Sequence, residues 1–221
     1  ITEDGSSSIF IAELDEHYHS VHGALQESRH VFINAGLKYK INQTDKIEIL
    51  EIGFGTGLNA LLTCIEALEN KKEIIYSAIE KYPLSELITS QLNYANLINY
   101  PDANQLFHTI HSCNWENDNS ISSFFRLKKY KMNIEDCSFQ QQFDIIYFDA
   151  FAPSAQPELW TENIFLSMFN ALKQNGILVT YCAKGSVKRI MKNAGFIVEA
   201  LPGPKGKREM TRAIKLQSLD E

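Results

Sequence analysis

The segment KIEILEIGFGTGLNALLTCIEAL, residues 46–68, constrains the fold of this chain more than any other stretch. It opens with an apolar run over 47–52 that predicts a buried β-strand. Three alternate glycines follow, and apolar side chains then recur at the spacing of one helix face. A strand, a tight glycine turn and a helix in direct succession form the first half of a unit that binds a nucleotide or nucleoside. The segment therefore predicts an α/β fold that holds an adenosine-containing cofactor.

The order of residues in this turn indicates the type of cofactor. A dinucleotide fingerprint reads G-x-G-x-x-G, whereas this turn reads Glu51-x-Gly53-x-Gly55-x-Gly57, with its third glycine one residue too early. A carboxylate at the end of the strand would repel a pyrophosphate, but it would attract the cationic methionine group of S-adenosylmethionine, directly or through water. We therefore expect S-adenosylmethionine as the cofactor. A glycine-rich turn without a ligand is the alternative.

Two further features predict contacts to the adenosine part of the cofactor. Glu80 ends the next apolar run, 74–79, where its carboxylate can accept hydrogen bonds from both ribose hydroxyls; a solvated strand-end glutamate is the alternative. Asn114 and Trp115 follow a predicted third strand over 106–110, where they can pair with the adenine and stack on it, although core packing explains Trp115 equally well. The predicted cofactor residues are Glu51, Gly53, Phe54, Gly55, Thr56, Gly57, Asn59, Glu80, Lys81, Asn114, Trp115 and Asp149.

Strands alternate with helices along the rest of the chain, which predicts a doubly wound α/β fold. We expect helices over 84–98, 157–174 and 187–193, and strands over 143–148, 177–183, 196–201 and 211–216. Residues 116–142 are polar and irregular and are expected to form an insertion. We divide the chain into an N-terminal extension that covers the site, residues 1–40, and a cofactor-binding domain, residues 41–221.

The charge and cysteine content of the chain limit the kinds of partner that it can bind. The net charge of −6 means that RNA would have to bind through a local basic patch. The four cysteines lack metal-site spacing and predict reduced thiols in a cytoplasmic protein. No apolar run approaches the roughly 20 residues of a membrane span. Three histidines over 17–22 lie in a predicted loop without a ligand pattern, so we expect no metal and a covering role for this segment instead. Its expected polar contacts are Tyr18, Glu27, Arg29 and His30.

Several segments together resemble one family, and they extend over nearly the whole chain. They are GALQESRHVFINAGL, LEIGFGTGLNALLT, DAFAPSAQPELWT, TYCAKGSVKRIMKNAGF and PGPKGKREM. This pattern resembles the methyltransferase domain of the MnmC family of tRNA wobble-uridine modification enzymes, also found as the stand-alone MnmD. The DAFAP and PELWT motifs are far more specific than the glycine turn, whereas 116–142 matches poorly. The resemblance implies a Rossmann-like class I methyltransferase, with a seven-stranded, mostly parallel sheet, an antiparallel last strand and helices on both faces.

The reaction implied by the resemblance is methyl transfer from S-adenosylmethionine to the amine of 5-aminomethyl-2-thiouridine in tRNA, giving 5-methylaminomethyl-2-thiouridine. Asp149 ends the strand over 143–148 at the edge where ligands gather, so it is the candidate to bind the amine and accept its proton. A strand-end hydrogen bond to the following turn is the alternative. No flavin oxidoreductase domain follows Glu221, so we expect separate enzymes to supply the aminomethyl precursor.

Substrate contacts are expected on both sides of Asp149. Phe151, Pro153 and Trp160 would exclude water and stack on a flipped-out base. Basic residues near the C-terminus would bind the RNA backbone, although solvated surface charge explains any single one of them. They are Lys184, Lys188, Arg189, Lys205, Lys207 and Arg208.

Two other functions fit the same pattern. A spermidine-synthase-like aminopropyltransferase shares the fold and an amine acceptor, but it should carry more acidic residues near the fourth strand. An inactive cofactor- or RNA-binding module is the other alternative, against which the intact Glu51, Glu80 and Asp149 argue.

Overall fold

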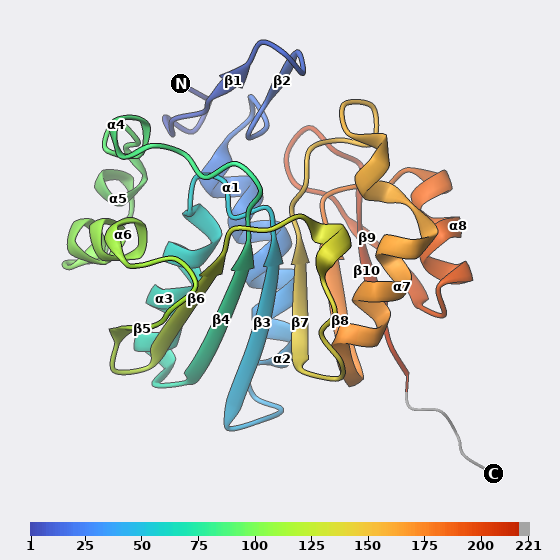
Figure 1. The fold of residues 1–221 in the computed structure, drawn as a ribbon. Helices are drawn as coiled ribbons and strands as arrows, with labels where there is room; N and C mark the ends of the chain where they lie inside the picture. The colour runs from blue at the N-terminus through green and yellow to red at the C-terminus, as the bar shows by residue number, and fades with distance from the viewer. Residues whose placement is uncertain (217–221) are drawn as a thin grey trace.

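The chain folds around a single eight-stranded sheet with the order β5-β6-β4-β3-β7-β8-β10-β9 (Figure 1). The computed structural model describes residues 1–216. β4, β3, β7 and β8 run parallel, as does β6 beside β4, whereas β10 is antiparallel to both of its neighbours. The predicted mostly parallel sheet with an antiparallel last strand is therefore confirmed, but it has eight strands instead of seven, because β5 adds an antiparallel edge strand. The strands are β3 (Lys46–Ile52), β4 (Glu73–Ile79), β5 (Asp118–Ser122), β6 (Phe125–Tyr130), β7 (Phe143–Phe148), β8 (Leu172–Thr180), β9 (Ile197–Pro202) and β10 (Glu209–Ile214).

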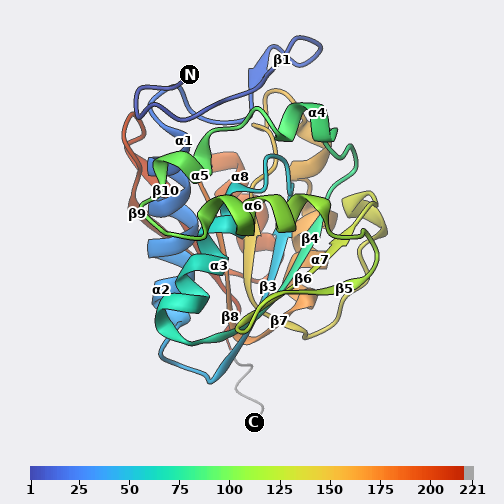
Figure 2. The ribbon, with the colours of Figure 1, turned by 90° about the vertical axis from the view of Figure 1, so that its left-hand side faces the viewer.

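Alternating side chains of the central strands divide the core into two layers. Ile49 and Tyr147 point into the layer that contains the helices α3 and α6, while Leu50 and Phe148 point into the layer that contains α7 and α8. Both faces of the central strands are buried, as expected for a parallel sheet covered on both sides. Figure 2 shows α3 and α7 on opposite sides of the sheet. The helices are α1 (Ala24–Ser28), the π-helix η1 (Arg29–Leu37), α2 (Lys38–Lys40), α3 (Leu58–Asn70), α4 (Glu86–Thr89), α5 (Tyr94–Leu97), α6 (Ala103–Ser112), η2 (Ile134–Asp136), η3 (Pro157–Trp160), α7 (Glu162–Ala171) and α8 (Gly185–Asn193).

The predicted third strand over 106–110 is wrong, because these residues lie in α6. Leu106, Phe107 and Ile110 are buried on one face of that helix. Their spacing is therefore that of a helix face, although the short apolar run was interpreted as a strand. The strand that takes this place in the sheet is β6, within the predicted insertion 116–142. The predicted helix over 84–98 is also wrong as one element, since it forms the short helices α4 and α5. The predicted helix 157–174 divides into η3 and α7 and ends at Ala171.

The N-terminal segment crosses the carboxyl ends of the strands. Its hairpin, β1 (Phe10–Ile11) and β2 (Glu16–His17), lies above the tips of β3 and β4 (Figure 1). Val31, Phe32 and Leu37 of η1, by contrast, belong to the main core. Core residues therefore lie on both sides of the boundary predicted at residue 40, since Leu37 and Ile41 belong to the same cluster.

None of the helices within residues 1–216 is long and apolar enough to cross a membrane. Over the same residues, no group of three or more His, Cys, Asp or Glu side chains is arranged to hold a metal ion.

Candidate active site

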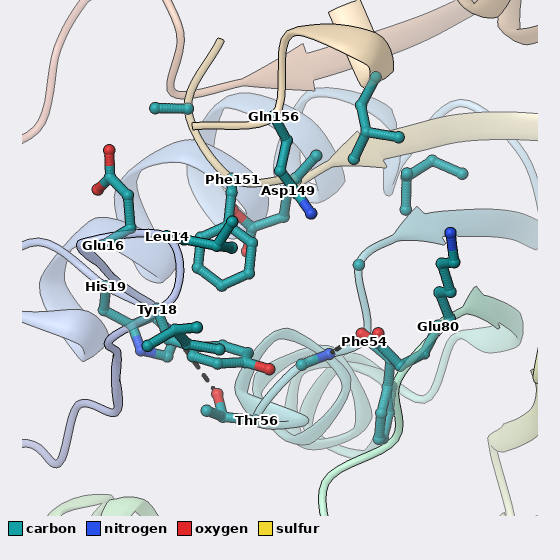
Figure 3. Close-up of a pocket in the computed structure, with 18 of the residues that line it drawn as sticks. Leu14, Glu16, Tyr18, His19, Phe54, Thr56, Glu80, Asp149, Phe151 and Gln156 are labelled. Atoms are coloured by element: carbon teal, nitrogen blue, oxygen red, sulfur yellow. Dashed lines mark hydrogen bonds between the residues drawn. The ribbon is translucent and has the colours of Figure 1, made fainter. Parts of the chain in front are cut away.

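A cavity of about 1000 Å³ lies at the carboxyl ends of β3, β4 and β7, beneath the N-terminal segment. Figure 3 shows Tyr18, Phe151, Asp149 and Glu80 arranged around it. The elements meet here because carboxyl ends of parallel strands share one edge of the sheet. The predicted residues in its wall are Tyr18, Glu27, Gly53, Phe54, Gly55, Thr56, Asn59, Glu80, Lys81, Asp149, Phe151 and Lys207.

The glycine turn brings the backbone close to neighbouring segments. Gly53 has φ +86°, and a Cβ there would lie 2.6 Å from the carbonyl oxygen of Asp149. Gly55 has φ +48°, and a Cβ there would lie 2.9 Å from the Tyr18 ring. The backbone N–H groups of Gly53 and Phe54 both donate to the carbonyl oxygen of Ile79, at 3.0 and 3.2 Å. The turn is thus fixed between β4 and β7, with its backbone exposed to the cavity as a cradle for a ligand.

Asn59 holds two acidic side chains together below and beside this cradle. Its Nδ2 donates to Glu51 Oε1 at 2.9 Å and to Asp149 Oδ2 at 2.8 Å. Burial, and then the charge of Asp149, raises the pKa of Glu51 well above its usual range. Burial, and then the charge of Glu27, raises the pKa of Asp149 to about 7, against the opposing hydrogen bond from Asn59.

The predicted contact of Glu51 with the cofactor needs correction. Glu51 is completely buried and is absent from the cavity wall. Its second oxygen has no hydrogen-bond partner among residues 1–216. Glu51 reaches the cavity only through Asn59, because that amide lies between its carboxylate and Asp149. Gly57 also lies outside the wall and packs against His111 instead.

Glu80 joins the end of β4 to the glycine turn. Its Oε2 accepts a hydrogen bond from the backbone N–H of Gly55 at 3.0 Å, and its Oε1 accepts one from the N–H of Tyr82 at 2.9 Å. A carboxylate oxygen can accept more than one hydrogen bond. Both oxygens therefore retain acceptor capacity at the cavity, as binding of two ribose hydroxyls would require.

The N-terminal segment covers the turn with aromatic side chains. Tyr18 packs edge-on against Phe151, with ring centroids 5.0 Å apart. Burial, and then the charge of Glu80, raises the pKa of Tyr18 to about 12, so the phenol stays neutral. His19 lies between Thr56 Oγ1 at 3.3 Å and the Tyr94 hydroxyl at 3.4 Å, and burial lowers its pKa to about 4. A neutral imidazole thus joins the covering segment to the turn.

Lys207 lies in the cavity wall rather than on an outer RNA-binding surface. Its Nζ pairs with Glu27 Oε1 at 2.7 Å and lies 3.9 Å from the centroid of the Tyr181 ring. The Tyr181 hydroxyl in turn donates to the carbonyl oxygen of Ala150 at 2.8 Å. Sequence reasoning missed Tyr181, although it directly follows β8 at the edge where Asp149 was expected.

Besides Glu51 and Gly57, other predicted contacts lie outside the cavity wall, namely Arg29, His30, Asn114, Trp115, Pro153 and Trp160. Asn114 is exposed, and Trp115 packs against Phe54, with ring centroids 5.9 Å apart. They follow α6 instead of a strand, and residues 132–134, after β6, line the cavity in their place. Trp160 is buried and its Nε1 donates to the carbonyl oxygen of Phe151 at 2.8 Å, so it supports the turn instead of facing a base. Pro153 is half-buried but is also outside the wall.

The remaining basic residues lie at the α8 and β9–β10 side of the molecule. Lys188 pairs with Glu209 at 2.7 Å, and Lys205 pairs with Glu3 at 2.9 Å. The other members are exposed and form no ion pair with any residue that the structure describes. They are Lys184, Arg189 and Arg208.

Comparison with known proteins places this geometry in a family. A family model described as S-adenosyl-L-methionine-dependent methyltransferase matches residues 102–216. The tRNA 5-methylaminomethyl-2-thiouridine biosynthesis bifunctional protein MnmC of Leptospira borgpetersenii is 30% identical over 211 residues, which cover 89% of this chain and 32% of that protein. The chain therefore spans about a third of the length of the curated relatives that it matches.

Solved structures agree with the family match. The crystal structure of MNMC2 from Aquifex aeolicus has a TM-score of 0.78 and 25% identity, and the match covers 96% of this chain and 67% of that one. Spermidine synthase from Thermotoga maritima has a TM-score of 0.55 at 15% identity over 90% of this chain and 62% of that one, which shows a shared fold alone. The predicted fold class, cofactor and resemblance to the MnmC methyltransferase domain are confirmed. Because the family model matches just over half of its 221 residues, this chain belongs to the S-adenosyl-L-methionine-dependent methyltransferases.

Proposed function

We propose that this methyltransferase acts on the amine of 5-aminomethyl-2-thiouridine at the wobble position of tRNA, giving 5-methylaminomethyl-2-thiouridine. The observation that carries the proposal is Asp149, a carboxyl group with a pKa of about 7 in the same cavity as the glycine turn. The name of the MnmC relative, which states biosynthesis of this modified uridine, supports the choice of acceptor.

The charge of the cavity suits a cationic cofactor and a cationic substrate group. S-adenosylmethionine, when bound, supplies a methyl group attached to a positively charged sulfur. Glu80 would hold its ribose, and the backbone of Gly53 and Gly55 would lie against it. Seven carboxyl groups line the cavity against two lysine ammonium groups, an excess that attracts both sulfonium and ammonium groups.

The substrate amine must lose a proton before its nitrogen can attack the methyl carbon. A free alkylamine resembles the lysine side chain, whose pKa is about 10.4 in water, so it is mostly protonated near neutral pH. Asp149 can bind the ammonium group, orient it and accept the proton. The aromatic rings of Tyr18 and Phe151 pack beside this position, and removal of water there would favour the neutral amine, opposing the effect of a nearby carboxylate. Orientation of the two reactants can contribute up to about 7–11 kcal/mol in the best cases.

Nucleoside analysis tests the proposal directly. tRNA that carries 5-aminomethyl-2-thiouridine is incubated with the protein and S-adenosylmethionine labelled at the methyl group, then digested and separated. We expect the label in 5-methylaminomethyl-2-thiouridine. If the protein binds the cofactor but no label enters this nucleoside, the proposed acceptor is wrong.

The acidic cavity also favours a second candidate, aminopropyl transfer to a polyamine. Seven carboxyl groups could bind a polycation, and this reaction uses decarboxylated S-adenosylmethionine. Calorimetric titration with both compounds distinguishes the two functions. A methyltransferase should prefer the carboxylated cofactor, whereas an aminopropyltransferase should prefer the decarboxylated one; binding of neither would favour an inactive module.

The activity should depend on the ionisation of Asp149. Its pKa of about 7 lies above the ordinary value of 3.8, so the protonated form, which cannot accept a proton, predominates below pH 7. We therefore expect kcat/KM for tRNA to rise with pH through about 7, because this parameter reports the ionisation of the enzyme before tRNA binds. Initial rates at saturating cofactor between pH 5.5 and 9 are the measurement, with S-adenosylmethionine affinity at each pH as the control. A flat profile through pH 7 would remove Asp149 as the proton acceptor.

The exposed arginines on the α8 and β9–β10 side of the molecule should contribute to tRNA binding. We expect the double variant Arg189→Ala/Arg208→Ala to bind tRNA more weakly and to reduce the salt dependence of log K by about 0.7–0.9 for each phosphate that is no longer neutralised. Lys46→Ala/Lys71→Ala is the matched control, because these exposed lysines lie at the amino ends of β3 and β4, away from the cavity. Filter binding at several salt concentrations is the measurement. Equal weakening in both variants would mean that only net charge matters.

A further inference from the structure

Lys129 is a fully buried lysine on β6, and the active site described above does not include it. Its Nζ donates to the backbone carbonyl oxygens of Ile110 at 2.8 Å and His111 at 2.9 Å, both at the end of α6. The same ammonium group lies 5.0 Å from the centroid of the Trp115 ring and 5.6 Å from that of Phe54. A buried charge is stable only when hydrogen bonds and other partners replace its water. Lys129 therefore joins β6, the last turn of α6 and two aromatic rings.

Two of these partners lead directly to the glycine turn. His111 Nε2 donates to the carbonyl oxygen of Thr56 at 3.1 Å. Burial lowers the pKa of His111 to about 4, so the ring is neutral and this hydrogen bond places its proton on Nε2. Phe54 packs edge-on against both His111, at 5.7 Å, and Trp115, at 5.9 Å, while its own ring lines the cavity. The end of α6 is thus the support behind the turn.

We propose that Lys129 is a positioning residue for the cofactor: it fixes the last turn of α6, and through His111 and Phe54 it holds the glycine turn in the shape that binds S-adenosylmethionine. Lys129 itself does not line the cavity. The same arrangement gives Trp115 a role other than adenine stacking, since its ring supports the Lys129 ammonium group.

A matched control residue exists at the opposite edge of the sheet. Lys215 is also buried, and its Nζ donates to the carbonyl oxygens of Phe169 and Leu172, both at 2.8 Å. Its ammonium group lies 4.7 Å from the centroid of the Phe169 ring. Leu172 pairs with Phe143 at the start of β7, far along the strand from the cavity. Lys215 thus reproduces the environment of Lys129 without a connection to the turn.

The test compares Lys129→Met with Lys215→Met. Each change removes an ammonium group and leaves two carbonyl oxygens without their donor, so both should lower the melting temperature by several degrees. We expect Lys129→Met to weaken S-adenosylmethionine binding by about tenfold and Lys215→Met to change it less than about twofold, as measured by calorimetry. Wild-type cofactor affinity in folded Lys129→Met, or an equal loss of affinity in Lys215→Met, would overturn the proposal.

A second variant covers the case in which Lys129→Met does not fold. His111→Phe keeps an aromatic ring beside Phe54 but removes the N–H that donates to Thr56. We expect it to weaken cofactor binding severalfold, while melting temperature falls less than in the lysine variants. Unchanged cofactor affinity in His111→Phe would contradict the proposal that His111 links Lys129 to the glycine turn.

Discussion

Replacing Asp149 by asparagine is expected to lower the rate constant of methyl transfer by about 10²–10⁴-fold, the usual contribution of a positioned general acid or base. Asparagine has nearly the same shape, and its amide oxygen can still accept the hydrogen bond that Asn59 Nδ2 donates to Asp149 at 2.8 Å. It cannot accept a proton from a substrate ammonium group, and it has no charge to attract one. The measurement is the single-turnover rate on tRNA at saturating S-adenosylmethionine.

Asp144→Asn provides the matched control on the same strand. Asp144 accepts hydrogen bonds from the Glu48 backbone at 2.8 Å and from Lys173 at 2.9 Å, near the start of β7. Its substitution should lower stability but leave the single-turnover rate unchanged. If Asp149→Asn weakened cofactor binding and left that rate unchanged, Asp149 would instead bind the methionine ammonium group. Retention of both properties would leave Asp149 without a role in the reaction.

The sequence predicted those strands and helices in which the buried positions are occupied by apolar residues at regular spacing. β3, the glycine turn and α3 were predictable because an apolar run, three alternate glycines and apolar residues at helical spacing follow one another directly in the sequence. β6 was missed because FRLKKY reads as a charged surface segment. Every second side chain of β6 nevertheless points into the core, since Phe125, Leu127 and Lys129 are all buried. Burial of Lys129 depends on carbonyl groups of α6, which no window around β6 contains.

The site residues also differ in whether their positions could be predicted from nearby sequence. Glu80, Asp149 and the glycine turn could be brought together from sequence, because parallel strands place their carboxyl ends at one edge. The position of Lys207 could not, because its partner Glu27 lies 180 residues earlier in the chain. Lys207 was therefore expected on a basic RNA-binding patch, whereas the structure places it in the cavity wall. Glu51 and Asn59 are only eight residues apart, but the spacing of residues did not show that the Asn59 amide faces this carboxylate.

Gly53→Ala should impair both stability and cofactor binding, because two separate costs act at this position. At φ +86° a Cβ costs about 1–2 kcal/mol in backbone strain. Its distance of 2.6 Å from the carbonyl oxygen of Asp149 adds an overpacking cost of about 1–3 kcal/mol. The turn cannot simply move away, since the N–H groups of Gly53 and Phe54 are both bound to Ile79. Any shift that relieves the clash therefore moves the cradle or Asp149.

Gly5→Ala separates these two costs. Gly5 has φ +82°, almost the same backbone conformation, but a Cβ there would meet no atom within 4 Å. We expect urea unfolding to show a destabilisation of about 1–2 kcal/mol for Gly5→Ala, from strain alone. For Gly53→Ala we expect a larger destabilisation together with about thirtyfold weaker S-adenosylmethionine binding, equivalent to roughly 2 kcal/mol. If both variants were destabilised equally and Gly53→Ala kept its cofactor affinity, the turn would tolerate a side chain next to Asp149. Gly53 would then be needed only for its backbone conformation.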